Sequence, residues 1–328
     1  MELHPMWNAY PTLQNELGET LSLMENAVRL KNKPVEQAVL QMIHAGGKML
    51  RPAYQLLFSG FGPERDRKKA TAIAAAIEML HTATLIHDDI VDEADLRRGL
   101  PSVRSQFGNS VAVYAGDYLF VSCFKLMSNY ASSMKSLQIH SRSMESILNG
   151  ELGQMNNRYK IDLSVDAYLE AISGKTAELF ALSCAIGAYE SGTSRKFAEQ
   201  AGKIGLAIGM AFQIMDDILD YTQDQTNLGK PVLEDVKQGV YSLPLILALE
   251  TDATQLRPLL EKRAQLSDKD QKFIFDLVHE LGGVTRAHHY AQKYTDEALT
   301  LIQKLPTTPG NEREQLATLT KTILFRQS

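Results

Sequence analysis

Apolar residues recur at three- and four-residue spacing along most of this chain. Side chains at positions i, i+3, i+4 and i+7 share one face of an α-helix. The pattern holds over 13–30, 35–45, 68–91, 110–130, 134–155, 166–190 and 195–224, and over several stretches after Leu243. The strict alternation of a half-buried strand is scarce. The pattern therefore predicts an all-α protein of ten or more helices.

Short segments rich in glycine, proline and polar residues separate these stretches. They lie at 45–48, 61–66, 97–102, 191–195, 227–231 and 304–311, where helix ends are expected. None has the length or the composition bias of an interdomain linker. We therefore expect residues 1–328 to form a single domain.

Composition excludes several classes of protein. The chain is 44% hydrophobic and carries a net charge of −5, so a general nucleic-acid-binding surface is not expected. The N-terminus lacks the basic start and apolar stretch of a signal peptide, and no uninterrupted apolar run reaches the ~20 residues of a transmembrane segment. Cys123 and Cys184 lie in apolar surroundings, which predicts buried free thiols. These features indicate a soluble, cytoplasmic protein.

An acidic motif occurs twice, each time after a long apolar run. DDIVD at 88–92 recurs as DDILD at 216–220. On a helix, the first and last aspartates of each motif lie one turn apart on one face, and the second lies beside them. Carboxylates ~5–6 Å apart repel by roughly 3 kcal/mol per pair at an effective dielectric constant of 20. Either motif alone is explained most simply as a solvated helix end, but the repetition favours one cavity that holds divalent cations.

The cation that suits such a cavity is Mg²⁺. It prefers oxygen ligands and usually combines one or two carboxylates with substrate phosphates, so the substrate should carry phosphate. The candidate metal ligands are Asp88, Asp89, Asp92, Asp216, Asp217 and Asp220. A ferritin-like di-metal bundle would instead need Glu-x-x-His pairs, and the histidines near the acids, His81 and His87, do not follow that spacing.

Basic residues that could complement a diphosphate occur in small, separated groups. They are Lys48, Arg51, Arg97, Arg98, Lys175 and Lys230. Lys48 and Arg51 lie three residues apart at a glycine break, where free backbone N–H groups can also bind an anion. Each of these residues alone could be a solvated or snorkelling side chain. Together with the aspartates they indicate a diphosphate site.

Uncharged positions near the motifs add to this pattern. His81 lies seven residues before Asp88 on the same helical face, where a core histidine would be the usual explanation. Gln213 lies four residues before Asp217 and so faces the same space. Gly205 and Gly209, on the helix of the second motif, are expected to allow close helix packing.

The ordered set of motifs resembles the trans-prenyl diphosphate synthase (polyprenyl synthetase) family, in particular its bacterial geranylgeranyl and heptaprenyl types. The matching segments are AGGKMLRP, HDDIVDEADLRRG, GKTAELF, QIMDDILD and GKPVLEDVKQGVYSLPL, and the similarity runs from about residue 40 to 250. The resemblance implies an all-α isoprenoid-synthase fold, usually a homodimer, in which three Mg²⁺ ions bridge carboxylates to an allylic diphosphate.

The resemblance also implies a role for each matching residue. Direct metal ligands would be Asp88, Asp92 and Asp216, while Asp89, Asp217 and Asp220 would act through water or through other ligands. Arg97, Lys175 and Lys230 would hold the allylic diphosphate. Lys48, Arg51, His81 and Arg98 would hold isopentenyl diphosphate. Thr176 and Gln213 would face the developing allylic cation.

The chemistry implied is ionisation, condensation and elimination. Departure of diphosphate leaves an allylic cation, the double bond of isopentenyl diphosphate attacks it, and the departing diphosphate removes a proton. No protein nucleophile is required. The sequence departs from the family pattern at Leu233, where glycine is common, and at Val240, where lysine or asparagine is common.

Product length should depend on the helix that carries Asp88. In the family, bulky residues four and five positions before the first aspartate give short products; here these are the small Thr84 and Ala83. Further down the same face, Leu80 and Ile77 are bulky enough to stop the chain, although both could be ordinary core residues. We expect a product of geranylgeranyl length or longer, with a long quinone-precursor chain favoured.

Two alternatives remain at this stage. The chain could be the catalytic subunit of a heterodimeric synthase that needs a smaller partner. A terpene cyclase on the same fold is disfavoured because the isopentenyl diphosphate residues Lys48, Arg51 and Arg98 are present. Glu93 and Asp95 are interpreted as solvated charge.

Overall fold

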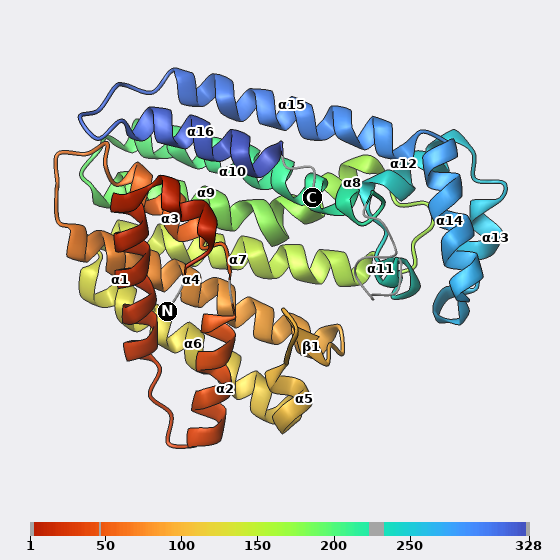
Figure 1. Ribbon diagram of the computed structural model, residues 1–328, viewed down its shortest axis with the longest axis horizontal. Helices are drawn as coiled ribbons and strands as arrows, with labels where there is room; N and C mark the ends of the chain where they lie inside the picture. The colour runs from red at the N-terminus through yellow and green to blue at the C-terminus, as the bar shows by residue number, and fades with distance from the viewer. Residues whose placement is uncertain (1–2, 46, 223–232, 326–328) are drawn as a thin grey trace. The chain divides into compact units, whose positions relative to one another are not determined.

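The computed structural model describes residues 3–45, 47–222 and 233–325, which are mostly helical (Figure 1). From the N-terminus the elements are η1 (Pro5–Ala9), α1 (Pro11–Ala27), α2 (Lys33–His44), α3 (Leu50–Phe58), α4 (Arg67–Val91), β1 (Leu96–Arg97), β2 (Leu100–Pro101), α5 (Val103–Phe107), α6 (Asn109–Tyr130) and α7 (Met134–Asn156). They continue with α8 (Val165–Ile172), η2 (Ser173–Ala177), α9 (Glu178–Glu190), α10 (Arg195–Leu219), α11 (Glu234–Lys237), α12 (Leu243–Thr251), α13 (Leu256–Leu260), η3 (Arg263–Gln265), α14 (Asp268–Glu280), α15 (Gly283–Gln303) and α16 (Glu312–Leu324). The predicted all-α class is confirmed.

The chain divides into two compact units, each made of separate stretches of sequence. Unit 1 comprises Met1–Ser141, Leu182–Gly202 and Pro306–Glu312. Unit 2 comprises Arg142–Ala181, Lys203–Leu305 and Arg313–Ser328. The first aspartate motif belongs to unit 1 and the second to unit 2.

The long helix α4 is the core of unit 1. Asp66 caps its N-terminus, because its side chain accepts a hydrogen bond from the backbone N–H of Lys69. Its buried residues lie all round the helix, as expected of a helix enclosed by others, and it packs against α1, α3 and α6. The alanine-rich run at 74–76 is completely buried and leaves room for these neighbours. The last turn of α4 carries Asp88 and Asp89, and Asp92 caps its C-terminus.

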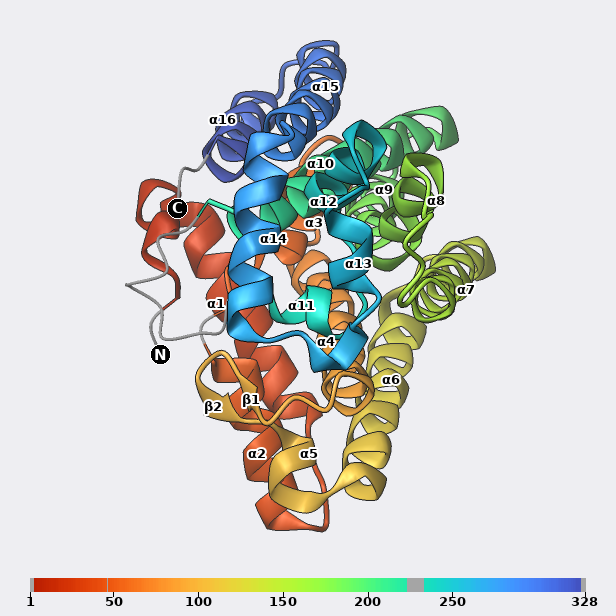
Figure 2. The same ribbon diagram turned by 90° about the vertical axis from the view of Figure 1, so that its right-hand side faces the viewer.

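A two-residue hairpin follows the first aspartate motif. Arg97 pairs with Leu100, and the two residues between them, Arg98 and Gly99, have φ values of 52° and 79°. Positive φ at both central positions is the signature of a type I′ turn, whose twist matches that of the flanking strands. Figure 2 shows this hairpin beside α5. The segment predicted as a simple break at 97–102 is therefore an ordered hairpin that separates the directions of its two arginines.

A π-helical turn interrupts the stretch predicted as one helix over 166–190. Residues Ser173–Ala177 form η2, a π-helix between α8 and α9. There the backbone approaches α7 closely: a Cβ atom on Gly150 would lie 2.4 Å from the backbone nitrogen of Lys175, and one on Gly174 would lie 2.8 Å from the Cα atom of Gly150. Single π turns inside helices are frequent at functional sites.

The glycines Gly205 and Gly209 of α10 allow the close packing expected of them. A Cβ atom on Gly205 would lie 2.3 Å from the carbonyl oxygen of Phe180, and one on Gly209 would lie 2.5 Å from the Cα atom of Ala177. These distances exclude any side chain at either position unless the backbones move apart. This prediction is confirmed.

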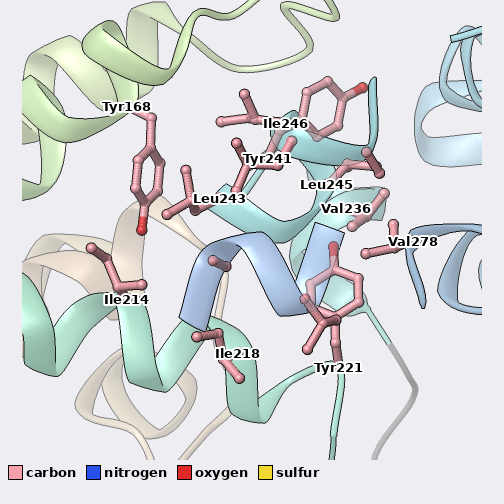
Figure 3. Packing of buried hydrophobic residues seen from close by; sticks show 14 of the residues in the cluster. Tyr168, Ile214, Ile218, Tyr221, Val236, Tyr241, Leu243, Leu245, Ile246 and Val278 are labelled. Atoms are coloured by element: carbon pink, nitrogen blue, oxygen red, sulfur yellow. The ribbon is translucent and has the colours of Figure 1, made fainter. Parts of the chain in front are cut away.

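The core of unit 2 gathers apolar side chains from α8, α10, α11, α12 and α14 (Figure 3). Tyr168 of α8 and Tyr221, just after α10, are both buried in it. In Figure 3 the hydroxyl group of Tyr168 points toward the helix that carries Ile214 and Ile218. Leu233 also belongs to this core, although its φ of 56° is in the left-handed region that favours glycine.

Among the residues that the structure describes, two helices, α4 and α6, are long and apolar enough to cross a membrane by length and composition alone. In α4, 78% of the most apolar window is buried inside the protein, as in the core helix of a soluble fold; in α6 the share is 39%. This is weak evidence for a membrane span, and the absence of a transmembrane segment stays a prediction. Cys123 and Cys184 are buried free thiols, as predicted.

Candidate active site

The first aspartate motif is built on the C-terminal turn of α4. The backbone N–H of Asp92 donates to the carbonyl oxygen of Asp88 at 2.8 Å, which keeps these residues one turn apart. Asp89 is only 1% exposed, and Arg97 donates to its Oδ1 from Nε at 2.7 Å and from Nη2 at 2.5 Å. Burial raises the pKa of Asp89, whereas the Arg97 guanidinium group lowers it. The arginine thus stabilises a carboxylate that the protein has removed from water.

The donor set of this motif suits a hard cation. Every ligand offered is a carboxylate oxygen, and the buried Oδ2 of Asp89 has no hydrogen-bond partner among the described residues. Within the same residues, no three acidic, histidine or cysteine side chains converge to hold a metal ion by themselves. Mg²⁺ commonly binds through one or two carboxylates, several waters and substrate phosphates, so its site does not need three converging protein ligands.

The second aspartate motif ends α10 and is held by a chain of hydrogen bonds within unit 2. Asp217 is buried, and its two oxygens accept hydrogen bonds from the Tyr168 hydroxyl at 2.6 Å and from the Gln213 Nε2 at 2.8 Å. The Thr176 hydroxyl donates to the Gln213 Oε1 at 2.8 Å. Burial outweighs the hydrogen bonds from Tyr168 and Gln213, which lower the pKa of Asp217, so that this pKa is raised to about 7.

This chain of contacts fixes the amide of Gln213. Because Nε2 donates to Asp217 and Oε1 accepts from Thr176, its orientation is determined at both ends. Neighbouring Asp220 lies just beyond α10, and its backbone N–H donates to the Asp216 carbonyl oxygen at 3.4 Å. The structure therefore brings together Thr176, Gln213 and Asp217 from the predicted residues of unit 2.

Lys175 lies in the π-helical turn and contacts α7. Its Nζ donates to Gln154 Oε1 at 2.8 Å and lies 2.9 Å from Glu151 Oε2. The close crossing at Gly150 and Gly174 places the lysine backbone directly against α7. The ammonium group is thus held between a carboxylate and an amide.

Another basic group lies in unit 1, around His81. Arg51 Nη1 lies 3.1 Å from His81 Nε2, and because a guanidinium group can only donate, this nitrogen accepts. Burial lowers the pKa of His81 well below its usual value, and the charges of Arg51, Arg98 and Arg97 lower it further. His81 is therefore a neutral ring that orients Arg51, and its own proton is on Nδ1.

The glycine break beside this group is held by Trp7. The indole Nε1 of this completely buried residue donates to the carbonyl oxygen of Lys48 at 3.0 Å. Gly47 leaves room for a guanidinium group, since a Cβ atom there would lie 2.7 Å from Arg98 Nη1. Arg97 and Arg98 thus diverge: one binds Asp89 and the other reaches the glycine break.

The remaining predicted residues are placed as follows. Lys230 lies outside the described residues. Of the chain-length positions, Ile77, Leu80 and Ala83 are buried and Thr84 is half-buried. The Thr84 hydroxyl donates to the His81 carbonyl oxygen at 2.8 Å.

The two departures from the family pattern both lie in unit 2. Leu233 packs in the core of that unit, and the backbone N–H of Val240 donates to the Asp235 carbonyl oxygen.

Sequence reasoning missed several residues of this arrangement. They are Trp7, Glu78, Glu151, Gln154 and Tyr168. Glu78 offered a signal, because an acidic residue three positions before His81 shares a face with it inside an otherwise apolar helix. Tyr168 offered none, since it is 49 positions from Asp217 in sequence.

The comparison with known families identifies the family of this chain. The family model for polyprenyl synthetase matches residues 32–278, three quarters of the chain, which include both aspartate motifs. This chain belongs to the polyprenyl synthetase family. The predicted family is thereby confirmed, and the chain is a prenyltransferase that forms a polyprenyl diphosphate.

Relatives cover nearly the whole of this polyprenyl synthetase. It is similar to a crystal structure of geranylgeranyl pyrophosphate synthase from Lactobacillus brevis, with 42% identity and a TM-score of 0.93 over 98% of this chain and 99% of that one. The heptaprenyl diphosphate synthase structure from Staphylococcus aureus is 30% identical, with a TM-score of 0.90 over 96% and 99% of the chains. Heptaprenyl diphosphate synthase component 2 of Geobacillus stearothermophilus is 32% identical over 297 residues, 90% of this chain and 92% of the relative. The predicted isoprenoid-synthase fold is confirmed by these structures.

Proposed function

We propose that this polyprenyl synthetase condenses isopentenyl diphosphate with an allylic prenyl diphosphate, in a Mg²⁺-dependent reaction, to give an all-trans product of geranylgeranyl length or longer. The observation that carries the proposal is the chain Thr176–Gln213–Asp217 beside Lys175. Within unit 2 it joins the second aspartate motif, a proposed metal site, to the oriented dipoles of the Thr176 hydroxyl and the Gln213 amide, with the Lys175 ammonium group next to Thr176 in sequence. Each of the three can stabilise charge that develops when an allylic diphosphate ionises.

The metal ions, three in number, would be held by the aspartate motifs, with Asp88, Asp92 and Asp216 as direct ligands. When bound, Mg²⁺ neutralises the charge that develops on the leaving diphosphate. Asp89 supports the first motif through its ion pair with Arg97, and Asp217 supports the second through Tyr168 and Gln213. Asp220 completes the second motif.

On the allylic side, Lys175, Arg97 and Lys230 bind the diphosphate that leaves. Lys175 exchanges its contacts with Glu151 and Gln154 for phosphate oxygens as the substrate arrives. The oxygen atoms of Thr176 and Gln213 stabilise the allylic cation, and their mutual hydrogen bond keeps them preorganised.

On the other side, Lys48, Arg51 and Arg98 bind isopentenyl diphosphate, with His81 as the neutral ring that orients Arg51. The arrangement is supported by Gly47, which leaves space for the Arg98 guanidinium group at the glycine break. The double bond then attacks the allylic cation, and the departing diphosphate takes the proton. No side chain has to act as a nucleophile.

We propose that residues 1–328 act as one polyprenyl synthetase domain in the cytoplasm. The two units support this, because each is made of separate sequence stretches and no single cut of the chain would divide them. We also propose a homodimer. Tyr114, Val121 and Phe124 are exposed and recur at helical spacing along one face of α6, which a second copy would cover.

A second candidate function is that of a catalytic subunit that needs a smaller partner chain. It is favoured by the relatives from Geobacillus stearothermophilus and Bacillus subtilis, which are both named component 2 of heptaprenyl diphosphate synthase. The same apolar face of α6 would then meet the partner.

Incubation with Mg²⁺, farnesyl diphosphate and labelled isopentenyl diphosphate tests both candidates. Turnover by the purified chain supports the leading proposal and rules out strict dependence on a partner. If the purified chain shows no turnover but becomes active when extract of the source cells is added, the heterodimer is supported. The variants Asp88→Asn and Asp216→Asn should each lose at least about 100-fold in kcat, since an oxyanion-stabilising group is typically worth 10²–10³.

A further inference from the structure

A buried carboxylate faces the basic group of unit 1, and the proposed reaction gives it no role. Glu78 of α4 is only 6% exposed and lies one turn before His81. It lines a pocket together with Gly47, Thr82 and Arg98. Its Oε2 atom is buried and has no hydrogen-bond partner among the described residues.

The charges of two arginines act on the carboxyl group of Glu78. Burial raises the pKa of its carboxyl group, and the positive charges of Arg51 and Arg98 lower it. An isolated ionised carboxylate is costly to bury, so its partners must be held close to it. In return, the carboxylate offsets the repulsion between the guanidinium groups of Arg98, which lines this pocket, and of Arg51, whose charge also acts on it.

We propose that Glu78 is a positioning residue that holds the guanidinium groups of Arg51 and Arg98 in the geometry that receives the diphosphate of isopentenyl diphosphate. The inference rests on the proposed function, because it takes this pocket to be the isopentenyl diphosphate site. His81 orients Arg51 from the next turn of the same helix, so α4 supplies two neighbouring side chains that organise the arginines.

A positioning role differs from a packing role in how substitutions rank. Glu78→Gln keeps the volume of the side chain but removes its charge. Glu78→Asp keeps the charge but leaves a small void. A packing role therefore makes the Asp variant the worse of the two, whereas charge-based positioning makes the Gln variant the worse.

The chain contains its own reporter for this pocket. Trp7 is its only tryptophan, and it donates to the Lys48 carbonyl oxygen at the glycine break. Intrinsic fluorescence can therefore follow binding of isopentenyl diphosphate to the full chain without an allylic substrate and without turnover. The matched control is Glu190→Gln, another buried carboxylate of unit 1, which instead pairs with Lys69.

The test measures Kd by fluorescence and KM for each substrate in the wild type and these variants. Glu78→Gln should raise Kd and KM for isopentenyl diphosphate by about tenfold or more, since the arginines lose the carboxylate charge that offsets their mutual repulsion. KM for the allylic substrate should stay within about twofold, as should every constant of Glu190→Gln. Glu78→Asp should lie between wild type and Glu78→Gln. The proposal is overturned if Glu78→Gln binds isopentenyl diphosphate as tightly as the wild type or more tightly, or if Glu78→Asp binds it more weakly than Glu78→Gln. If Glu78→Gln does not fold, the Kd of Glu78→Asp is compared with that of Glu190→Gln: a higher Kd in Glu78→Asp supports the proposal, and an equal one overturns it.

Arg98→Gln separates failure of this inference from failure of the proposed function. If Arg98→Gln leaves KM for isopentenyl diphosphate unchanged, the assignment of the pocket to that substrate is wrong. If it raises KM while Glu78→Gln does not, the pocket is correctly assigned and only the positioning role of Glu78 is refuted.

Discussion

The hydroxyl group of Tyr168 donates a 2.6 Å hydrogen bond to the buried Asp217, the second aspartate of the DDILD motif. This bond connects α8 to the end of α10 and leaves neither carboxylate oxygen without a donor, since Gln213 supplies the other. These donors favour the charged form of the carboxylate and oppose the burial that raises its pKa to about 7. The arrangement makes Tyr168 a support for the proposed metal site.

Tyr168→Phe should weaken that support. Removing the hydroxyl leaves one buried oxygen of Asp217 without its donor, which costs about 1–3 kcal/mol in the free energy of unfolding. The Mg²⁺ concentration for half-maximal activity should also rise, because a less ionised Asp217 weakens the acidic motif. Tyr118→Phe is the control, since its hydroxyl bonds only to backbone groups near Arg29. An unchanged Mg²⁺ requirement in Tyr168→Phe contradicts this account of Asp217.

The crossing of α7 and η2 makes Gly150 sensitive to any side chain. A Cβ atom there would lie 2.4 Å from the Lys175 backbone nitrogen, so Gly150→Ala should lower the free energy of unfolding by about 1–3 kcal/mol and displace Lys175. Gly153 lies on the same helix, and a Cβ atom there would have nothing within 4 Å, so Gly153→Ala should be neutral or stabilise by up to about 1 kcal/mol. Chemical denaturation and kcat of both variants check this pair; equal losses would show that the crossing does not position Lys175.

Stability should fall on acidification because of His140. This residue is completely buried, its Nε2 lies 3.3 Å from the sulfur of Cys123, and burial lowers its pKa to about 4. Between pH 6.5 and 4 the unfolded chain therefore binds a proton that the folded chain does not. The free energy of unfolding falls by about 3 kcal/mol over this pH range.

The comparison that isolates His140 is wild type against His140→Gln, because the lowered pKa of His81 adds a similar slope to both proteins. Their difference in the free energy of unfolding should change by about 3 kcal/mol from pH 7 to pH 4, with the wild type losing more. Parallel curves would rule out a buried neutral His140.

Product length should respond to the α4 residues before the first aspartate motif. Thr84 is half-buried, so Thr84→Phe places a bulky ring on the proposed path of the growing chain and should shorten the product. Ile77 is completely buried further down the helix, so Ile77→Ala should lengthen it. Chromatography of the products checks both, and unchanged length in both variants refutes the assignment of this path.

The sequence predicted best what depends on local pattern. The periodicity of 68–91 and 110–130 predicted α4 and α6 almost to their ends, because long apolar faces specify long packed helices. The α3 helix was not predicted, since its nine residues are too few for a periodic pattern to distinguish a helix from another short buried segment. The hairpin at Leu96–Pro101 was interpreted as a break because its strands have only two residues each.

The site was predictable in its charged residues and less so in their partners. The aspartates, lysines and arginines were found by motif, because their spacing expresses the chemistry. The π turn at Lys175 could not be found that way, since it depends on the contact of Gly174 with Gly150 from a separate helix. Tyr168 and Glu151 were missed for the same reason: their roles come from tertiary contacts across many residues of sequence.

The most direct test of the central claim is the chain length of the product that the purified protein forms from farnesyl diphosphate and labelled isopentenyl diphosphate. We predict Mg²⁺-dependent label in an all-trans polyprenyl diphosphate of geranylgeranyl length or longer, abolished when a chelator removes the metal. Absence of any labelled polyprenyl product, both from the chain alone and after addition of source-cell extract, would contradict the account.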